Sequence, residues 1–218
     1  MLNKLELENG ESLDCSKIVC IARNYSEHIK ELNNAKPKRP IFFIKPNSAL
    51  LNQGKRILLP EFSSNIHHEI ELAVVIGKNG HAIPEEKVED YILGYAVALD
   101  LTARDLQTEM KDGGYSWEMA KAFDHSCPIS SIRLKEDVPS IENLNIEFFI
   151  NNELKQSGNT NQMIYTIPQM ISEMSRFFTL TRGDVILTGT PKGVGQIHSG
   201  DGLHGKIESV GELFFEVI

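Results

Sequence analysis

The stretch from His67 to Ile76 constrains the fold most, because it is rich in aliphatic residues and yet contains two glutamates. In a β-strand, successive side chains point to opposite faces. One face of this strand would then be wholly aliphatic, with Ile70, Leu72, Val74 and Ile76. Glu69 and Glu71 would share the other face with Ala73. Since an unpaired buried carboxylate is very costly, the pair predicts either a solvent-facing strand or a divalent metal site.

The bulk composition allows a folded domain and argues against several kinds of partner. The chain has 218 residues, 41% of them hydrophobic and 24% charged, so a packed core is feasible. We predict one domain over residues 1–218, with a short strand region over 1–16. The net charge is −8 and the chain has no long basic run, which argues against nucleic acid or an anionic membrane as the main partner.

Cysteine usage and hydropathy predict the compartment. The three cysteines form no CxxC motif, which favours free thiols in a reducing compartment over a disulfide framework or a zinc-thiolate site. No apolar run approaches the roughly 20 residues that a membrane helix needs. The N-terminus lacks the pattern of a signal peptide. We therefore expect a cytoplasmic protein.

Most of the predicted elements are strands. Alternation and apolar runs predict them at 17–22, 42–44, 66–76, 145–150 and 184–188, with two more within 205–218. The run 91–99 fits a strand buried on both faces or a buried helix. Because strands outnumber helices and do not alternate regularly with them, the fold class is α+β and β-rich.

The helices are fewer and shorter. Thr166 and Gln169 fit a capping box, so the clearest helix begins after Thr166. A short helix is expected near residue 26, with Asn24 or Ser26 as its cap. Residues 33–40 are predicted to form a loop, and residues 102–119 a loop with helical pieces.

Three carboxylates are candidate metal ligands. Asp100 ends the apolar run 91–99, and together with Glu69 and Glu71 it would offer oxygen ligands. Such a set suits Mg²⁺, Mn²⁺ or Ca²⁺ better than zinc. The residues alone also fit a simpler arrangement, in which the glutamates face solvent and Asp100 is a turn residue at the end of a strand.

Two further groups could carry chemistry. His28 and Glu31 lie on one face if their segment is helical, and a carboxylate that holds a histidine is a common general base. The same spacing fits a solvated ion pair. Lys121 stands among apolar residues, where it could stabilise developing negative charge or extend to solvent.

The segment Thr188-Gly189-Thr190-Pro191-Lys192-Gly193 is rich in glycine. Its glycines would let backbone N–H groups approach an anion closely. It does not match the phosphate-loop pattern, and an ordinary glycine-rich turn fits it equally well.

In their order along the chain, these motifs resemble the fumarylacetoacetate hydrolase (FAH) family. The resemblance is strongest to its single-domain acylpyruvase and oxaloacetate decarboxylase branch. The matching segments extend from about residue 17 to the C-terminus. They are Ile21–Tyr25, Glu69–Glu71, Leu99–Asp105, Lys121 with its flanks, and Ile186–Gly195.

The resemblance implies a single catalytic domain with a mixed β-sandwich roll, short peripheral helices, a lid helix and a homodimer. It implies that Glu69, Glu71 and Asp100 bind Mg²⁺ or Mn²⁺, with Ca²⁺ as a substitute in crystals. His28 and Glu31 match a dyad on the lid helix, and Lys121 matches an active-site lysine. Positions implied to contact substrate are Arg23, Tyr25, Lys45, Gln107, Gly189 and Thr190.

The activity implied is metal-dependent cleavage of a carbon–carbon bond in a small 2-keto acid, through an enolate that the metal stabilises. The substrate would be an acylpyruvate, which is hydrolysed, or oxaloacetate, which is decarboxylated. Alternatives on the same scaffold are an isomerase or decarboxylase of 2-hydroxy-dienoates and an oxaloacetate keto–enol tautomerase. A protein that binds such ligands without turnover is a further alternative, which the His28–Glu31 pair argues against.

Overall fold

A computed structural model of the protein describes residues 3–32 and 37–218. Its largest sheet is mixed and has the strand order β4-β3-β14-β7-β8-β10-β5, with β11 paired to β8. The pairs β3–β14 and β5–β10 are parallel, and the others are antiparallel. The strands are β3 (Lys17–Ala22), β4 (Ile41–Pro46), β5 (Leu50–Asn52), β7 (Ile70–Ile76), β8 (Ile92–Leu99), β10 (Cys127–Ile129), β11 (Arg133–Leu134) and β14 (Val185–Leu187).

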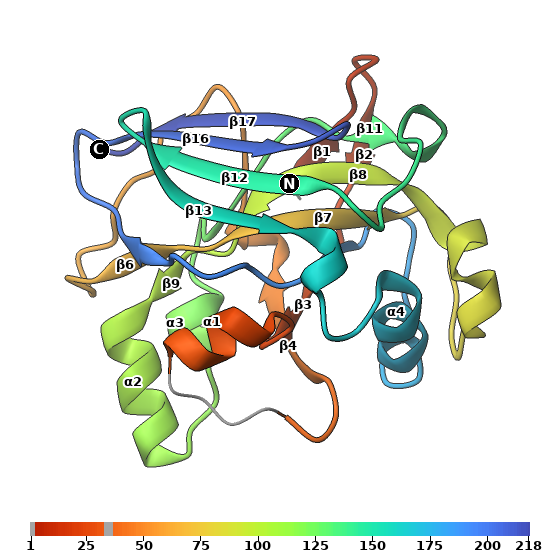
Figure 1. Cartoon of the computed structure of the whole chain (residues 1–218), viewed down its shortest axis with the longest axis horizontal. Coiled ribbons are helices and arrows are strands. Elements are labelled where there is room, and N and C mark those ends of the chain that lie inside the picture. The colour runs from red at the N-terminus through yellow and green to blue at the C-terminus, as the bar shows by residue number, and fades with distance from the viewer. Residues whose placement is uncertain (1–2, 33–36) are drawn as a thin grey trace.

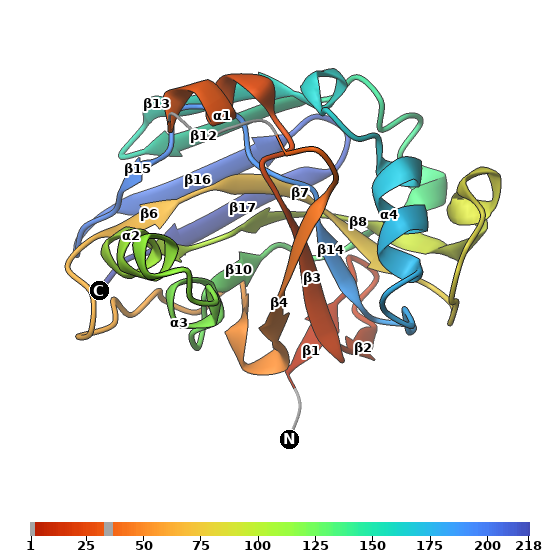
Figure 2. The same cartoon turned by 90° about the horizontal axis from the view of Figure 1, so that it is seen from below.

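A second sheet, antiparallel and four-stranded, lies over one face of the first (Figures 1 and 2). Its order is β13 (Glu153–Asn159), β12 (Asn145–Ile150), β16 (Gly202–Ile207) and β17 (Gly211–Glu216). The main core fills the space between the sheets, where Ile146 and Phe148 of β12 belong to the same cluster as Leu72 and Val74 of β7. The predicted β-rich α+β fold with a sandwich-like core is confirmed.

The opposite face of the larger sheet is also covered. A hairpin of β1 (Lys4–Glu6) and β2 (Ser12–Asp14) contributes Leu5 to a second apolar cluster, which includes Ala73 and Val75 of β7. Every residue of β7 is therefore buried. The alternative of a solvent-facing strand is wrong, so the glutamates beside Ala73 lie in the interior.

The helices lie around the sheets. They are α1 (Ser26–Glu31), α2 (Arg104–Gly113), α3 (Glu118–Lys121) and α4 (Ile167–Ser175), with 3₁₀ turns η1 (Asn47–Ala49), η2 (Glu85–Tyr91), η3 (Lys135–Asp137) and η4 (Thr160–Gln162). Helices α2 and α3 lie side by side in both views, apart from α4 (Figures 1 and 2). No helix in the described part of the chain is long and apolar enough to cross a membrane.

One local prediction is confirmed, and one turn is explained by its residue type. The Thr166–Gln169 capping box begins α4, with both reciprocal hydrogen bonds present. Asn151 and Asn152 form the turn between β12 and β13 with positive φ angles of 52° and 66°. Asparagine tolerates this left-handed conformation better than most residues, which explains its use in the turn.

Two predictions are wrong, and a third, the loop with helical pieces at 102–119, is confirmed only in part. The expected strand 66–76 is broken at Glu69 into β6 (Ile66–His68) and β7, and β6 pairs instead with β9 (Thr102–Ala103) and β15 (Gly195–Gln196). Much of the segment 102–119 is the ten-residue helix α2. Helix α1 has Tyr25 as its N-cap, with no side-chain cap. Of the loop predicted at 33–40, residues 33–36 lie outside the described chain.

Candidate active site

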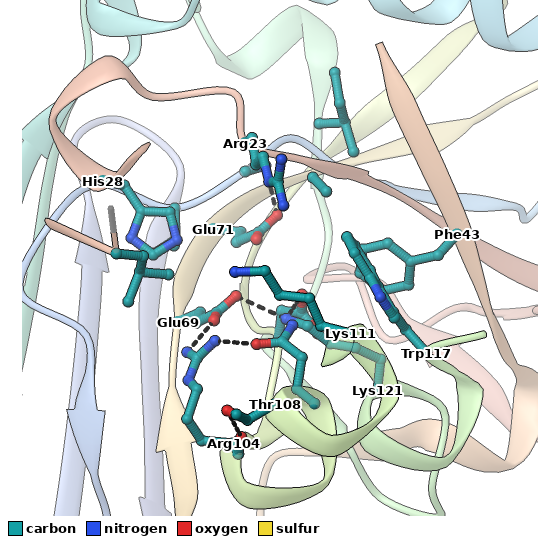
Figure 3. A pocket seen from close by; sticks show the side chains of 17 residues that line it. Arg23, His28, Phe43, Glu69, Glu71, Arg104, Thr108, Lys111, Trp117 and Lys121 are labelled. Carbon is teal, nitrogen blue, oxygen red and sulfur yellow. Dashed lines mark hydrogen bonds and ion pairs between the residues drawn. The ribbon is translucent and has the colours of Figure 1, made fainter. Parts of the chain in front are cut away.

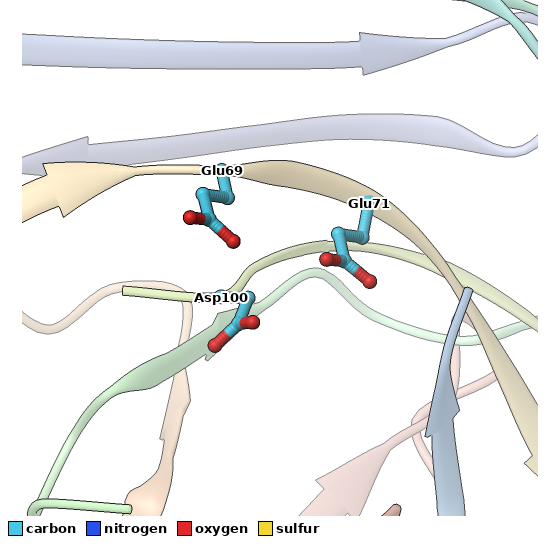
Figure 4. A group of neighbouring side chains, drawn as sticks. All are labelled: Glu69, Glu71 and Asp100. Carbon is cyan, nitrogen blue, oxygen red and sulfur yellow. The ribbon is translucent and has the colours of Figure 1, made fainter. Parts of the chain in front are cut away.

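Glu69, Glu71 and Asp100 converge at one end of the larger sheet (Figure 4). Antiparallel pairing of β7 with β8 sets Ile70 opposite Leu99, and the Asp100 N–H donates to the Glu69 carbonyl at 2.8 Å. This register brings the start of β7 next to the end of β8. One ligand oxygen from each carboxylate lies within 4.8 Å of the others, and all three residues are buried.

Three cations contact Glu69 and Asp100: Lys45 and Lys121 are buried, and Arg104 is partly exposed. Lys121 Nζ lies 2.8 Å from Glu69 Oε2 and 2.6 Å from Asp100 Oδ2. Arg104 Nη2 lies 2.5 Å from Glu69 Oε1. Lys45 Nζ lies 2.8 Å from Asp100 Oδ1. Such pairing is what allows several ionised groups to be buried together.

The three acidic groups do not have equal support for ionisation. Burial opposes ionisation of Glu69, but the positive charges of Lys121 and Arg104 outweigh it and hold the pKa of Glu69 below its usual range. Burial raises the pKa of Glu71 well above its usual range, and the nearby charges of Asp100 and Glu69 raise it further. Additional positive charge is therefore what would keep all three carboxylates ionised together.

This donor set fits a divalent cation. It offers only carboxylate oxygens, the ligands that Mg²⁺ and Mn²⁺ prefer. The Lys121 ammonium already contacts Glu69 and Asp100, which shows that the cluster stabilises positive charge at this position. Glu69, Glu71 and Asp100 are thus the residues that would hold the ion.

The carboxylates line a cavity of about 160 Å³ (Figure 3). The predicted site residues on its wall are Arg23, His28, Glu69, Glu71, Asp100, Gln107, Lys121, Gly189 and Thr190. The cavity wall thus combines residues from β3, α1, β7, α2, α3 and the glycine-rich loop. Arg23 points toward Glu71 (Figure 3).

The pair on helix α1 has the geometry of an oriented base. His28 Nδ1 lies 3.2 Å from Glu31 Oε2. The other oxygen of Glu31 accepts a hydrogen bond from the Gly193 N–H at 2.9 Å. Glu31 does not line the cavity itself, so it acts on the orientation of His28 and links α1 to the glycine-rich loop.

The glycine-rich loop also meets the carboxylates directly. The Gly189 N–H donates to Glu71 Oε2 at 2.6 Å. Gly189 has φ of 95°, and a Cβ there would lie 2.8 Å from Asn24 Cβ, so both conformation and space favour glycine. The Asn24 side chain donates to the Tyr165 and Thr188 carbonyls and accepts from the Tyr165 N–H. It therefore fixes the loop instead of capping α1.

Tyr25 and Lys45, predicted to contact substrate, do not line the cavity. The buried Tyr25 hydroxyl has no hydrogen-bond partner in the described chain, and burial raises the pKa of Tyr25. Lys45 is fully buried behind Asp100, where its ammonium also donates to the Lys121 carbonyl and to Ser126 Oγ. From this position Lys45 holds Asp100 and the end of α3 in place.

The residues 17–218 match the model of a protein family described as fumarylacetoacetate (FAA) hydrolase, C-terminal. The chain belongs to the FAH family. The match covers every element that contributes to the cavity, and it agrees with the resemblance carried by the sequence motifs. Members include hydrolases, isomerases and tautomerases, and this chain is an enzyme of that kind.

Individual FAH relatives differ in the activity they are named for. The chain is 46% identical over 200 residues to the mitochondrial oxaloacetate tautomerase FAHD1 of Bos taurus. The alignment covers 92% of this chain and 90% of the relative. It is 48% identical over 189 residues to the oxaloacetate tautomerase YcgM of Escherichia coli, in an alignment that covers 86% of each chain.

The cytoplasmic location and the homodimer stay predictions.

Solved structures of the FAH family share the fold. The fumarylpyruvate hydrolase of Pseudomonas aeruginosa, crystallised with Mn²⁺ and pyruvate, superimposes with a TM-score of 0.95 at 35% identity. The alignment covers 100% of this chain and 96% of that chain. A family member from Mycobacterium smegmatis, 5-carboxymethyl-2-hydroxymuconate delta-isomerase, gives 0.83 at 33% identity, covering 96% and 85%.

Sequence reasoning missed several residues on the cavity wall of this FAH domain. Arg104 contacts Glu69 and, at 2.5 Å, Gln107 Oε1, but its place in the motif Leu99–Asp105 does not indicate this role. Phe43 and Trp117 pack edge to face at 6.2 Å and form an aromatic wall. No local pattern pointed to them, because they lie on β4 and just before α3, 74 positions apart.

Proposed function

We propose that this chain is a divalent-metal-dependent enzyme that interconverts the keto and enol forms of oxaloacetate or a closely related 2-oxo acid. One observation carries the proposal: three buried carboxylates and an oriented histidine face the same small cavity. Relatives at 46% and 48% identity are named oxaloacetate tautomerases, which supports this reaction over others of the family.

The reaction requires removal of a proton from the carbon next to the 2-oxo group. When bound, a divalent ion supplies electrostatic stabilisation for the negative charge that develops on the 2-oxo oxygen. Glu31 engages His28 Nδ1, which leaves Nε2 as the nitrogen that exchanges the proton with carbon. Lys121 supplies fixed positive charge beside the developing anion.

Hydrolysis of an acylpyruvate is the second candidate. It is supported by the near-identical fold of the fumarylpyruvate hydrolase crystallised with Mn²⁺ and pyruvate. In that reaction His28 would deprotonate a water that attacks the distal carbonyl, and the enolate of pyruvate would leave. Decarboxylation of oxaloacetate would release CO₂ and give the same enolate without attack by water, so one site could support all three outcomes.

A comparison of substrates tests the proposal. We would measure, with and without Mg²⁺ or Mn²⁺, the approach of oxaloacetate to keto–enol equilibrium, its decarboxylation, and the hydrolysis of acetylpyruvate and fumarylpyruvate. We expect metal-dependent tautomerisation as the fastest reaction, and its loss in His28→Ala by about a hundredfold or more. Faster hydrolysis of an acylpyruvate would favour the second candidate, and metal-independent turnover of every substrate would contradict both.

A further inference from the structure

Gln156 is a buried side chain of β13 that connects the four-stranded sheet to the active site. Its Oε1 accepts a hydrogen bond from the Ile70 N–H at 3.1 Å and lies 2.8 Å from His68 Nδ1. These two partners lie on either side of the break between β6 and β7. Gln156 therefore completes the hydrogen bonding of the backbone beside the metal-ligand pair.

The other end of the same amide contacts the glycine-rich loop. Gln156 Nε2 donates to Thr190 Oγ1 and to the Pro191 carbonyl, both at 2.8 Å. With His68 in the tautomer that carries its proton on Nδ1, all the hydrogen-bonding capacity of the amide is used: two bonds to its oxygen and two from its nitrogen.

Two backbone groups fix which way round the amide lies. The Ile70 N–H needs an acceptor, so it must meet Oε1, and the Pro191 carbonyl needs a donor, so it must meet Nε2. In a flipped amide, Nε2 would face the Ile70 N–H, donor against donor, and Oε1 would face the Pro191 carbonyl, acceptor against acceptor. Thr190 Oγ1 consequently faces an N–H donor, and its hydroxyl acts as the acceptor of that bond.

This assignment determines the direction of the Thr190 proton. Because Gln156 donates to Thr190 Oγ1, the hydroxyl proton must point elsewhere, and Thr190 lies on the cavity wall. Within residues 3–32 and 37–218, no acceptor of a hydrogen bond from this hydroxyl is found. A buried donor without a protein acceptor is costly unless a ligand or water supplies the acceptor.

We propose that Gln156 is a positioning residue that keeps the Thr190 hydroxyl as a hydrogen-bond donor to an anionic oxygen of the bound ligand. The inference rests on the proposed function, which provides a carboxylate or enolate oxygen in this cavity. Gln156 does not touch the ligand. It acts because the Thr190 hydroxyl, which accepts a hydrogen bond from Gln156, cannot donate its own proton to Gln156 and is left to donate toward the cavity. The site thereby prefers a ligand atom that can only accept, such as a carboxylate oxygen, over a hydroxyl or amine.

The test is a double-mutant cycle that uses oxalate as the probe, in the presence of saturating Mn²⁺. Gln156→Glu keeps the size of the side chain but replaces the donor by an acceptor, so Thr190 would donate to the new carboxylate and turn its proton away from the cavity. We expect oxalate affinity to fall roughly tenfold to a hundredfold, the loss typical of a charge-assisted hydrogen bond. Thr190→Val should cause a similar loss, and Gln156→Glu should add less than about twofold in the Thr190→Val background.

Controls separate positioning from a general structural effect. Gln162→Glu makes the same chemical change at an exposed residue, and it should leave oxalate affinity unchanged. Gln156→Met, which retains length without hydrogen bonding, provides a second cycle if the buried carboxylate prevents folding. Mn²⁺ affinity measured without oxalate should change less than about threefold in each folded Gln156 variant, because the inference concerns the ligand and not the ion.

The outcomes are distinguishable. Wild-type protein that binds neither Mn²⁺ nor oxalate would overturn the proposed function and this role with it. The wild type could instead bind both, while the double variant loses oxalate affinity by the product of the two single losses. That result would overturn the role of Gln156 alone. A Gln156 variant whose main loss is in Mn²⁺ affinity would also overturn it, since Gln156 would then act on the carboxylates.

Discussion

Strands β3 and β14 run parallel and side by side, and a buried carboxylate lies at each end of the pair. At their start, Asp184 is fully buried and its Oδ2 lies 2.5 Å from Lys17 Nζ and accepts from the Thr181 N–H at 2.6 Å. At their end, the Gly189 N–H meets Glu71, and the cavity begins.

The difference between the two ends shows how a buried charge is used. Asp184 has one lysine and does not border the cavity, so its charge is matched within the fold. Glu71 shares a small space with Asp100 and Glu69, and burial together with these neighbours raises its pKa well above the usual range. The charge of Asp184 is balanced by Lys17, although Asp184 Oδ1 has no hydrogen-bond partner in the described chain, whereas the carboxylates around Glu71 would be stabilised by an added cation.

The largest expected effect is on catalysis at the cavity end. Glu71→Gln keeps the shape of the side chain but removes one anionic ligand, and with it several kcal/mol of charge stabilisation when the ion is bound. We expect metal-dependent turnover to fall by roughly a thousandfold or more. Since the substitution also relieves repulsion among the carboxylates, unfolding of the variant by urea in EDTA should occur at an equal or higher midpoint than that of the wild type. Retention of near-wild-type turnover would show that Glu71 is not a ligand.

The opposite result is expected at the other end. Asp184→Ala removes the acceptor from Lys17 and from the Thr181 N–H, so the free energy of unfolding should fall by about 3 kcal/mol. Urea denaturation would measure this loss. The kcat of the folded fraction should stay within about twofold of wild type, because Asp184 lies outside the cavity wall. A large loss of kcat at full folding would show that the two ends are coupled.

The sequence predicted part of the cavity end. The expected period-two alternation placed Glu69 and Glu71 on one face, and the two side chains do lie close together, although β7 itself begins at Ile70. It could not show the break at Glu69, because the Ile70 N–H finds its acceptor in Gln156, 86 positions away. A tertiary partner of this kind leaves no local pattern.

The same limit applies to the remaining site residues. Asn24 has the residue type of a helix cap, but its side chain forms hydrogen bonds with Tyr165 and Thr188 and does not cap α1. Lys45 lies on an unremarkable strand, and its contact with Asp100 arises from the way the sheet brings distant segments together. The resemblance to the FAH family identified the positions, whereas their contacts required the three-dimensional fold.

A smaller effect is expected on thermal stability. It sharpens the comparison because the same ion is added to a variant altered at each end. Binding to the native state stabilises a protein by about 2.7 kcal/mol when the ligand is at a hundred times its Kd, which for a chain of this size raises Tm by roughly 5–10 °C. We expect Mn²⁺ to raise Tm by this amount in the wild type and in Asp184→Ala, although the latter starts from a lower value. Glu71→Gln should show little or no shift. Differential scanning calorimetry with matched Mn²⁺ and EDTA samples measures all three, and an equal shift in Glu71→Gln would place the ion away from this cluster.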